Sequence, residues 1–201
     1  WIPHYKNGHW KHNNNGWWYQ RLDGSWPTKQ WELIDGAWYY FNNAGYMVTG
    51  WLNLNGTWYY LDKNGIMLVD SQKINGTWHY FDSSGKMVTG WVNIKGTWYY
   101  YAPGNGGMYG QGWHWINGKC YYMYASGAMA ANTWIGNDYV DSSGAWIPGY
   151  ARASWIQSGN RWWYRHSDGS YPRSAWELIN GKWYHFDSAG WMQTGWLNLN
   201  G

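Results

Sequence analysis

Tryptophan pairs whose members stand seven residues apart recur along this chain. Trp51 and Trp58 form one pair, and the same spacing returns at Trp10/Trp17, Trp31/Trp38, Trp91/Trp98, Trp155/Trp162 and Trp176/Trp183. Two rings of a pair and a third ring from a neighbouring unit would enclose a small void that suits neither a metal ion nor an anion. Such a void suits a quaternary ammonium, which cannot donate a hydrogen bond and is held by ring quadrupoles at roughly 2 kcal/mol per desolvated contact. The pairs are therefore candidate cages for a choline-like cation.

The sequence around each pair predicts a β-hairpin. Residues 51–54 and 57–61 alternate as strands do, and Asn55-Gly56 between them suits a tight two-residue turn. Trp58 and Tyr60 share one face of the second strand, so Tyr60 and its equivalents are the expected third rings. Since a single hairpin is marginal in water, the units must stack. The expected fold class is all-β, a solenoid of stacked β-hairpin repeats of about 20 residues.

The repeat extends along the whole sequence, which predicts one array of about nine units over residues 1–201. The units are marked by turn glycines: Gly24, Gly45, Gly65, Gly85, Gly107, Gly127, Gly144, Gly169 and Gly190. Residues 1–56 return as residues 146–201 at a constant offset of 145, with more than half of the positions identical. Residues 132–154 form a degenerate unit. Ser71 replaces a leading Trp and Cys120 replaces a second Trp, so we expect incomplete cages at both positions.

Composition excludes several classes of protein. Trp, Tyr and Phe number 23, 20 and 3, whereas only 12% of the residues are charged, which argues against a disordered tail or an amphipathic helical bundle. The net charge is only +3 and the sequence has no run of basic residues, so no nucleic-acid partner is expected. No apolar run approaches the roughly 18 residues of a membrane span, so no membrane insertion is expected. The lone cysteine, Cys120, rules out an internal disulfide framework.

No set of residues predicts catalysis, a resident metal or a cofactor. His4, His9 and His12 cluster, but we interpret them as exposed turn residues. Asp62 and Asp82 recur at turn positions, where short polar side chains cap the backbone. No Ser/His/Asp set, zinc-ligand pattern or phosphate-binding glycine loop recurs with supporting context. We therefore expect a non-catalytic binding module, with any catalytic domain outside these residues.

Two longer phrases resemble a known family. They are Trp-Tyr-Arg-His-Ser-Asp-Gly-Ser-Tyr-Pro at residues 163–172 and Trp-Tyr-His-Phe-Asp-Ser-Ala-Gly-Trp-Met at residues 183–192. They are similar to the choline-binding repeats of pneumococcal autolysins and phage lysins. The resemblance covers most of the chain and implies a secreted module at the surface of a Gram-positive bacterium, anchored to choline or phosphocholine on the teichoic acids of the cell wall. It also implies that each ligand lies between consecutive repeats, with two aromatics from one hairpin, one from the next, and often a Met.

Carried over to this sequence, the resemblance implies choline-binding sites at the intact pairs. The expected sets are Trp31, Trp38 and Tyr60; Trp51, Trp58 and Tyr80; Trp91, Trp98 and Tyr122; and Trp10, Trp17 and Tyr40. Trp155 and Trp162 would meet His185 in place of a Tyr. Met67 and Met87 would either line these sites or fill gaps between units. The residues expected in the core are Tyr39, Phe41, Tyr59, Leu61, Tyr99 and Tyr121.

Two other functions stay open at this point. The glucan-binding repeats of streptococcal glucosyltransferases and the repeats of large clostridial toxins look similar, and a carbohydrate-binding array would combine an aromatic platform with polar side chains such as Asn53, Asn93 and Asn198. A purely structural spacer would explain the degenerate units but not six preserved tryptophan pairs. Members of the choline-binding family often pair end to end, so a homodimer is a further expectation.

Overall fold

The computed structural model describes residues 8–198, so the repeated Trp-Ile-Pro of residues 1–3 and the end of the duplicated block at residues 199–201 lie outside the described range. The described residues form twenty β-strands and no helix, which confirms the predicted all-β chain of hairpin repeats. The chain divides into two compact units, Trp1–Tyr109 and Gly110–Gly201, which are treated separately below. That residues 1–201 form one array stays a prediction.

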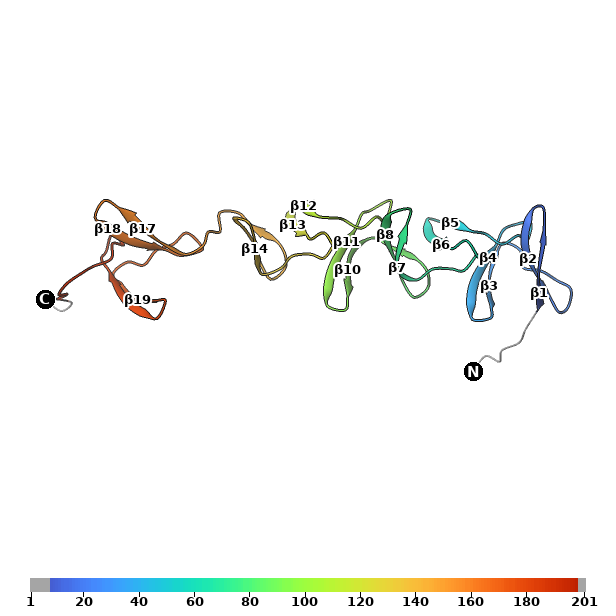
Figure 1. Ribbon diagram of the computed structural model, residues 1–201, viewed down its shortest axis with the longest axis horizontal. Helices are drawn as coiled ribbons and strands as arrows, with labels where there is room; N and C mark the ends of the chain where they lie inside the picture. Colours follow the sequence, from blue (N-terminus) through green and yellow to red (C-terminus); the bar gives the residue numbers. More distant parts are fainter. Residues whose placement is uncertain (1–7, 199–201) are drawn as a thin grey trace. The chain divides into compact units, whose positions relative to one another are not determined.

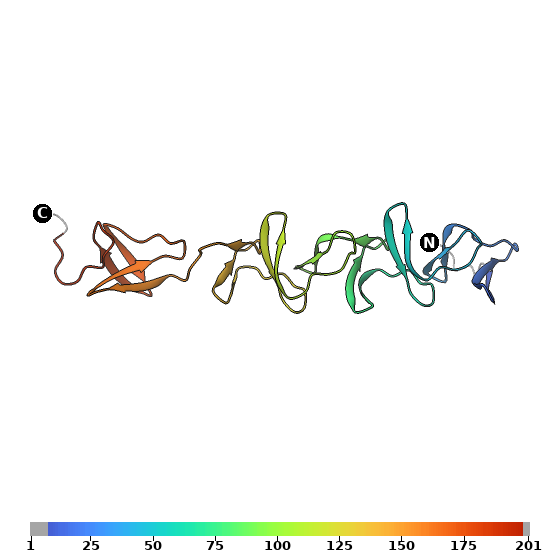
Figure 2. The same cartoon turned by 90° about the horizontal axis from the view of Figure 1, so that it is seen from above.

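The first unit contains five hairpins, each made of two consecutive antiparallel strands. Within this unit, successive hairpins project in different directions (Figures 1 and 2). Strand β9 adds a short third strand to the β7–β8 hairpin. The strands are β1 (Gly8–Asn13), β2 (Gly16–Arg21), β3 (Gln30–Ile34), β4 (Ala37–Phe41), β5 (Gly50–Leu54), β6 (Thr57–Leu61), β7 (Asp70–Ile74), β8 (Thr77–Phe81), β9 (Met87–Val88), β10 (Gly90–Ile94) and β11 (Thr97–Tyr101).

The second unit contains four further hairpins. Residues 132–154, where the sequence pattern is weakest, still fold into the short β14–β15 hairpin, which β16 extends to three strands. The strands are β12 (Gly112–Ile116), β13 (Lys119–Met123), β14 (Thr133–Ile135), β15 (Asp138–Val140), β16 (Trp146–Ile147), β17 (Ser154–Ser158), β18 (Arg161–Arg165), β19 (Ala175–Ile179) and β20 (Lys182–Phe186).

The Asn-Gly and related dipeptides form the hairpin turns. Asn55 and Gly56 have φ angles of 52° and 87°, so both central residues of the turn are left-handed. This is the backbone of a type I′ turn, whose twist matches that of the flanking strands and which Asn and Gly tolerate best. The turn fixes the register in which Trp51 pairs with Tyr60, and Asn53 with Trp58. The two tryptophans of a pair therefore lie on one face of their hairpin, on opposite strands.

The loop after each hairpin returns the chain to the preceding hairpin. Asp62 Oδ1 accepts backbone hydrogen bonds from Asn64 and Ile66, as the turn position of this aspartate predicted. The backbone N–H of Met67 then donates to the carbonyl oxygen of Trp38, 2.9 Å away, and Met47 makes the equivalent bond to Trp17. These bonds hold each Met against the hairpin that precedes its own.

In seven of the nine described hairpins the core is the buried last residue of the second strand, whereas β2 and β18 end in Arg21 and Arg165. Phe41, Leu61 and Phe81 are completely buried, as expected for Phe41 and Leu61. Phe41 bridges to Met47 across the loop, and the Trp10 ring of the preceding hairpin stacks over Phe41 with ring centroids 5.9 Å apart. One large buried side chain thus fills the junction between two hairpins, and no extended aliphatic core is needed.

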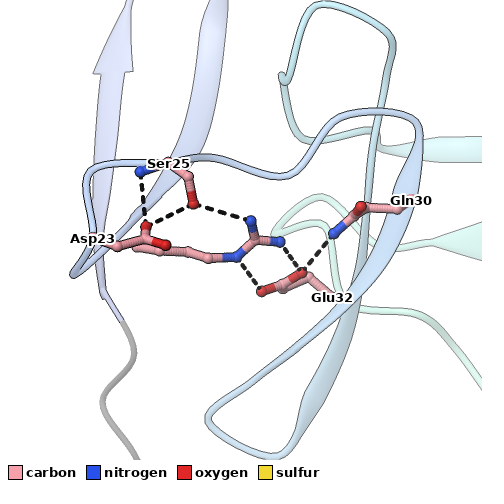
Figure 3. A network of polar contacts seen from close by, with 5 residues as sticks. Asp23, Ser25, Gln30 and Glu32 are labelled. Atoms are coloured by element: carbon pink, nitrogen blue, oxygen red, sulfur yellow. Dashed lines mark hydrogen bonds and ion pairs between the residues drawn. The ribbon is translucent and has the colours of Figure 1, made fainter.

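A polar network joins the first two hairpins on their outer side (Figure 3). The Arg21 guanidinium donates from Nε and Nη2 to the two oxygens of Glu32, at 2.9 and 2.8 Å. Gln30 donates to the same carboxylate, while Ser25 accepts from Arg21 Nη1 and donates to Asp23. In the duplicated block, His166 and Glu177 hold the positions of Arg21 and Glu32, and His166 Nε2 lies 2.7 Å from Glu177 Oε1.

We expect Glu32→Gln to lower the free energy of unfolding by about 1 kcal/mol at neutral pH, because it removes the bidentate ion pair. The side-chain hydrogen bonds from Arg21 hold the pKa of Glu32 below its usual range. A carboxylate of depressed pKa stabilises the fold above its unfolded-state pKa and loses that contribution as the pH falls through its folded-state pKa. Urea unfolding at neutral and acid pH checks this: the two proteins should converge in acid. A difference that is the same at every pH would contradict the assignment.

Candidate functional site

The two rings of a tryptophan pair stand at right angles to each other. Trp51 and Trp58 have centroids 6.1 Å apart and an interplanar angle of 89°, and Trp91 and Trp98 repeat this arrangement at 6.5 Å and 88°. Trp51 also packs edge-on against Tyr60 of its own hairpin, at 5.1 Å. These two hairpins therefore each present two perpendicular aromatic walls, on the face that the pairing register gives to both indoles.

The third wall comes from the next hairpin, one residue earlier in the strand than the sequence predicted. Tyr39 lies against Trp10 at 4.9 Å, Tyr59 against Trp31 at 5.0 Å, His79 against Trp51 at 4.9 Å and, in the second unit, Tyr184 against Trp155 at 4.7 Å. The expected partners of these pairs were Tyr40, Tyr60, Tyr80 and His185. Tyr39 and Tyr59, expected in the core, are half-buried, and Tyr39 packs against the buried Tyr19, Ile34 and Phe41.

Strand geometry explains the shift. Neighbouring residues of a strand point to opposite faces, and Tyr40 already faces the Trp31 of its own hairpin at 5.2 Å. Tyr39 is on the other face, which meets the preceding hairpin. Tyr60 and Trp51 pair in the same way as Tyr40 and Trp31, and Tyr80 lies near Tyr101 at 6.0 Å.

Three successive junctions of the first unit enclose cavities of the same design. We call each a junction cage: a tryptophan pair, the aromatic of the next hairpin, and the Met that follows that hairpin. Trp10, Trp17, Tyr39 and Met47 line a cavity of about 420 Å³, and Trp31, Trp38, Tyr59 and Met67 line one of about 310 Å³. Trp51, Trp58 and Met87 line the third, of about 260 Å³, where His79 packs against Trp51 from behind the cavity wall. Residues of the following loop close one side of each cage: Lys63 and Asn64; Ser83, Ser84 and Lys86; and Gly104 and Asn105.

The methionines line the cages and also pack against the following loop. Met47, Met67 and Met87 each contribute to a cavity wall, and the Sδ of Met47 lies where a Cβ on Gly65 would stand, 2.2 Å away. Met67 approaches Gly85 and Met87 approaches Gly106 in the same way. The two roles that the sequence left open for Met67 and Met87 therefore coexist in the structure.

The second tryptophan of each pair is left open to solvent. Trp17, Trp38 and Trp58 are 48%, 43% and 39% exposed, whereas a Trp side chain is on average highly buried in a folded protein. A row of half-exposed indoles facing cavities of ligand size is a feature of binding surfaces.

In the last of these cages the ring behind Trp51 is His79, which is buried with 6% exposure. Burial lowers the pKa of His79, and a hydrogen bond to the backbone of Gly106 opposes this shift in part. Within the described residues its Nδ1 has no hydrogen-bond partner. The imidazole is thus a neutral wall at physiological pH, and it replaces the Tyr of the neighbouring cages.

We expect cation binding in the Trp51/Trp58/His79 cage to weaken in acid, because an imidazolium would repel a bound cation. Since the pKa of His79 is lowered, affinity is retained through neutral pH and is lost as the pH falls below the ordinary histidine range. Choline titrations monitored by the Trp58 indole N–H signal at neutral and acid pH would measure it, with His79→Tyr as the matched control of constant affinity. Equal acid sensitivity of wild type and variant would exclude His79 as the cause.

At two places where the repeat pattern is interrupted, another side chain of the protein occupies the junction between hairpins. At Ser71, the missing indole is compensated by Tyr101, which stands where other repeats have Phe, is 1% exposed and is hydrogen-bonded to the Ser71 side chain. In the second unit, the guanidinium of Arg152 lies over the Trp134 ring at 5.1 Å, so the chain's own cation covers this unpaired indole. Neither junction resembles the three cages above.

The remaining expected site residues are divided between the two units. Trp91 and Trp98 belong to the first unit and Tyr122 to the second, where Tyr122 packs on Trp113 of its own hairpin at 5.3 Å, as Tyr60 does on Trp51. Trp155 and Trp162 keep the expected positions in the second unit, with Tyr184 as the facing ring. Trp18 and Trp26, at the repeat positions of Tyr39 and Met47, line a further cavity of about 300 Å³ with Tyr46.

Residues 8–198 contain neither a metal-binding group nor a membrane-spanning helix. No three His, Cys, Asp or Glu side chains converge there as a metal-binding group. The same range contains no helix with the length and apolar character needed to cross a bilayer.

Family models match most of the chain. Models of a choline-binding repeat match residues 28–71, 68–113 and 111–146, and a model described as a "Putative cell wall binding repeat" matches residues 174–192. A protein of Streptococcus pneumoniae serotype 4 named "Putative endo-beta-N-acetylglucosaminidase" is 31% identical over 74 residues, which are 36% of this chain and 11% of that protein.

Solved structures of the same architecture come from pneumococcus. The structure of CbpJ from Streptococcus pneumoniae is 31% identical with a TM-score of 0.61, covering 89% of this chain and 62% of that one. Choline binding protein F of the same species, solved in the presence of a peptidoglycan analogue, is 33% identical with a TM-score of 0.60, covering 89% and 61%. The chain thus spans about three fifths of these solved proteins and about a tenth of the curated relative.

Proposed function

Because the chain belongs to the choline-binding repeat family, we propose that it is the cell-wall-binding module of a secreted surface protein and holds choline groups of teichoic acid in its junction cages. The observation that carries the proposal is the recurrence of one arrangement at three successive junctions: two indoles and a Met line each cavity, and a ring of the next hairpin packs against the first indole. A glucan-binding array is not favoured, because the matching family models are choline-binding repeats and a similar solved structure is a choline binding protein.

Each part of the cage matches one property of a trimethylammonium group. Two indoles line each cavity, and the quadrupoles of such rings stabilise a cation without any hydrogen bond. The Met side chain adapts to the methyl groups through dispersion. None of these groups carries a negative charge, so affinity at one cage comes from several contacts of about 1–2 kcal/mol each and remains modest.

Several weak cages in a row give strong retention on a polymer. Millimolar affinity at one site corresponds to only about 4 kcal/mol. Once one choline of a teichoic acid chain is bound, the next is presented at high effective concentration, which raises overall avidity by roughly a hundredfold or more where the spacing allows it. Such retention suits an anchor for an effector domain carried elsewhere in the protein. We extend the proposal to pairing of two modules as a homodimer.

A titration of near-ultraviolet circular dichroism and intrinsic Trp fluorescence with choline tests the proposal. We expect a saturable change with choline and a higher melting temperature, because the ligand binds only the folded cages. Glucose and short glucans, run in parallel, should give no change. Silence with choline and a saturable response to a glycan would replace the proposal with the carbohydrate-binding alternative.

A further inference from the structure

One junction of the second unit has the layout of a cage but different chemistry. Val140 is fully buried at the end of β15, as Phe41 is at the end of β4, and Val140 pairs with Trp146 as Phe41 bridges to Met47. Trp146 therefore holds the position of the cage Met. Asp138, two residues before Val140, holds the position of the third-wall ring.

The preceding hairpin supplies the rest of this junction. Trp113 keeps the place of the first indole, and Cys120 stands where the second indole would be, directly opposite Trp115. A thiol is much smaller than an indole, so the wall recedes there, while Trp115 on the same face is 68% exposed. Burial raises the pKa of the Cys120 thiol and the negative charge of Asp138 raises it further, so the thiol is neutral.

The side chains of this junction converge on one place. The Trp113 and Trp146 rings have centroids 6.4 Å apart with an interplanar angle of 65°. Trp146 Nε1 donates to Asp138 Oδ1 at 3.0 Å, so one carboxylate oxygen is fixed beside the Trp146 ring. Both Asp138 and Trp146 are half-buried. The result is an anionic group hydrogen-bonded to Trp146, whose ring lies against Trp113, at a repeat position where the other cages have an aromatic ring.

The charge of Asp138 is not balanced by the protein. In the part of the chain that the structure describes, the ion pairs use Glu32, Asp187 and Glu177, and none involves Asp138. A half-buried carboxylate beside apolar rings is costly without a counter-ion. Accepting the Trp146 N–H would not by itself call for a charge, since an Asn side chain offers the same acceptor. The arrangement therefore favours a bound cation.

The nature of the walls selects the kind of cation. A quaternary ammonium can only present C–H groups to Asp138, whereas a protonated amine can donate N–H groups to the carboxylate in charge-assisted hydrogen bonds, which are about twice as strong as neutral ones. We propose that this junction is an amine site: it binds a protonated primary or secondary amine in preference to choline.

Two sources on a bacterial surface share this chemistry: the α-ammonium of an aminoacyl ester on a polymer, and the side-chain ammonium of a lysine-type residue in a peptide. Alanine methyl ester and Nα-acetyl-lysine amide are probes for them. Either compound should bind at this junction more tightly than choline, and the tighter one identifies the source. The amine site is independent of the choline cages, so its failure and theirs are seen at different residues.

Indole N–H signals of the ¹⁵N-labelled protein resolve the two kinds of site, with Trp146→Phe and Trp58→Phe identifying the signals of Trp146 and Trp58. The ligands are ethanolamine, its mono- and dimethyl derivatives, and choline. We expect the ratio of ethanolamine to choline affinity at Trp146 to exceed the ratio at Trp58 at least tenfold. The proposal is overturned if Trp146 ignores all four compounds or prefers choline as Trp58 does.

Asp138→Asn is the matched variant, because it keeps an acceptor for the Trp146 N–H and removes only the charge. It should reduce the ethanolamine preference at Trp146 to the value at Trp58, with choline binding at Trp58 and the melting temperature unchanged. Asp138→Tyr is a second variant that restores the third ring and should shift the preference at Trp146 toward choline. An amine preference that persists in both variants would show that Asp138 acts only as a structural acceptor.

Discussion

Trp58→Ala is expected to weaken choline binding in its cage about thirtyfold while leaving the fold nearly as stable as wild type. The loss corresponds to about 2 kcal/mol, the value of a desolvated cation–π contact. The effect on stability is small because the Trp58 ring is 39% exposed and forms a wall of the cavity. Trp51→Ala, by contrast, also removes contacts to Tyr60, His79 and Phe81, and should lower the melting temperature as well.

Trp78→Ala provides the matched control. Trp78 is 41% exposed and occupies the same strand position as Trp58, but its partner position is Ser71, so no tryptophan pair exists there. We expect this variant to bind choline as wild type does. Titrations of each variant, followed by retention on a choline-bearing resin, measure both effects. Equal losses for Trp58→Ala and Trp78→Ala would mean that choline is held by surface indoles in general and not by cages.

Gly65→Ala is expected to destabilise the protein by about 1–2 kcal/mol and to weaken the Trp10/Trp17/Tyr39 cage. Gly65 has a φ of 81°, a left-handed conformation that costs an L-residue this amount. In addition, its new Cβ would stand 2.2 Å from Met47 Sδ, so the Met must leave the cavity wall. Thermal melts and choline titration at Trp17 give the two quantities.

Gly36→Ala separates backbone strain from the displacement of Met47. Gly36 has a φ of 82°, and a Cβ there would meet no atom within 4 Å. It should therefore lower the melting temperature to a similar extent without changing choline affinity at Trp17. If both variants lose affinity equally, Met47 has no part in binding and the loss reflects the fold.

The hairpins could be predicted because their determinants are local. Asn55-Gly56 and its equivalents specify left-handed turns, and the alternation of the flanking residues sets which side chains share a face. The tryptophan pair follows from the same register, since Trp58 stands diagonally across from Trp51. Everything inside one repeat is therefore contained in about 20 consecutive residues.

The third wall could not be predicted in the same way because it depends on how two hairpins dock. Tyr39 and Tyr40 are the same residue type on opposite faces, so composition cannot distinguish them. The strand register could have distinguished them, because Tyr40 lies opposite Trp31 in its own hairpin and its ring contacts that indole. Once that pairing is drawn, Tyr39 is the ring left to face the preceding repeat.

The residues that compensate for interruptions of the repeat could not be predicted from the sequence pattern either. Ser71 and Tyr101 stand thirty residues apart, and their hydrogen bond becomes visible only when the hairpins are stacked. Asp138 and Trp146 belong to a segment with little resemblance to the repeat, yet they occupy cage positions defined by the burial of Val140. In such segments the structural positions of the repeat are kept, but the residue types at those positions differ.

The backbone bonds that hold Met47 and Met67 to the preceding hairpins have a mechanical consequence. A ligand in a junction cage is enclosed by one hairpin, the next one and the loop beyond it, so no hairpin in the first unit can peel away without opening a filled cage. Under tension between the wall and an attached domain, ligand release and repeat unravelling become one event. The force needed to detach the protein should therefore rise with cage occupancy, and extension should proceed in steps of one repeat.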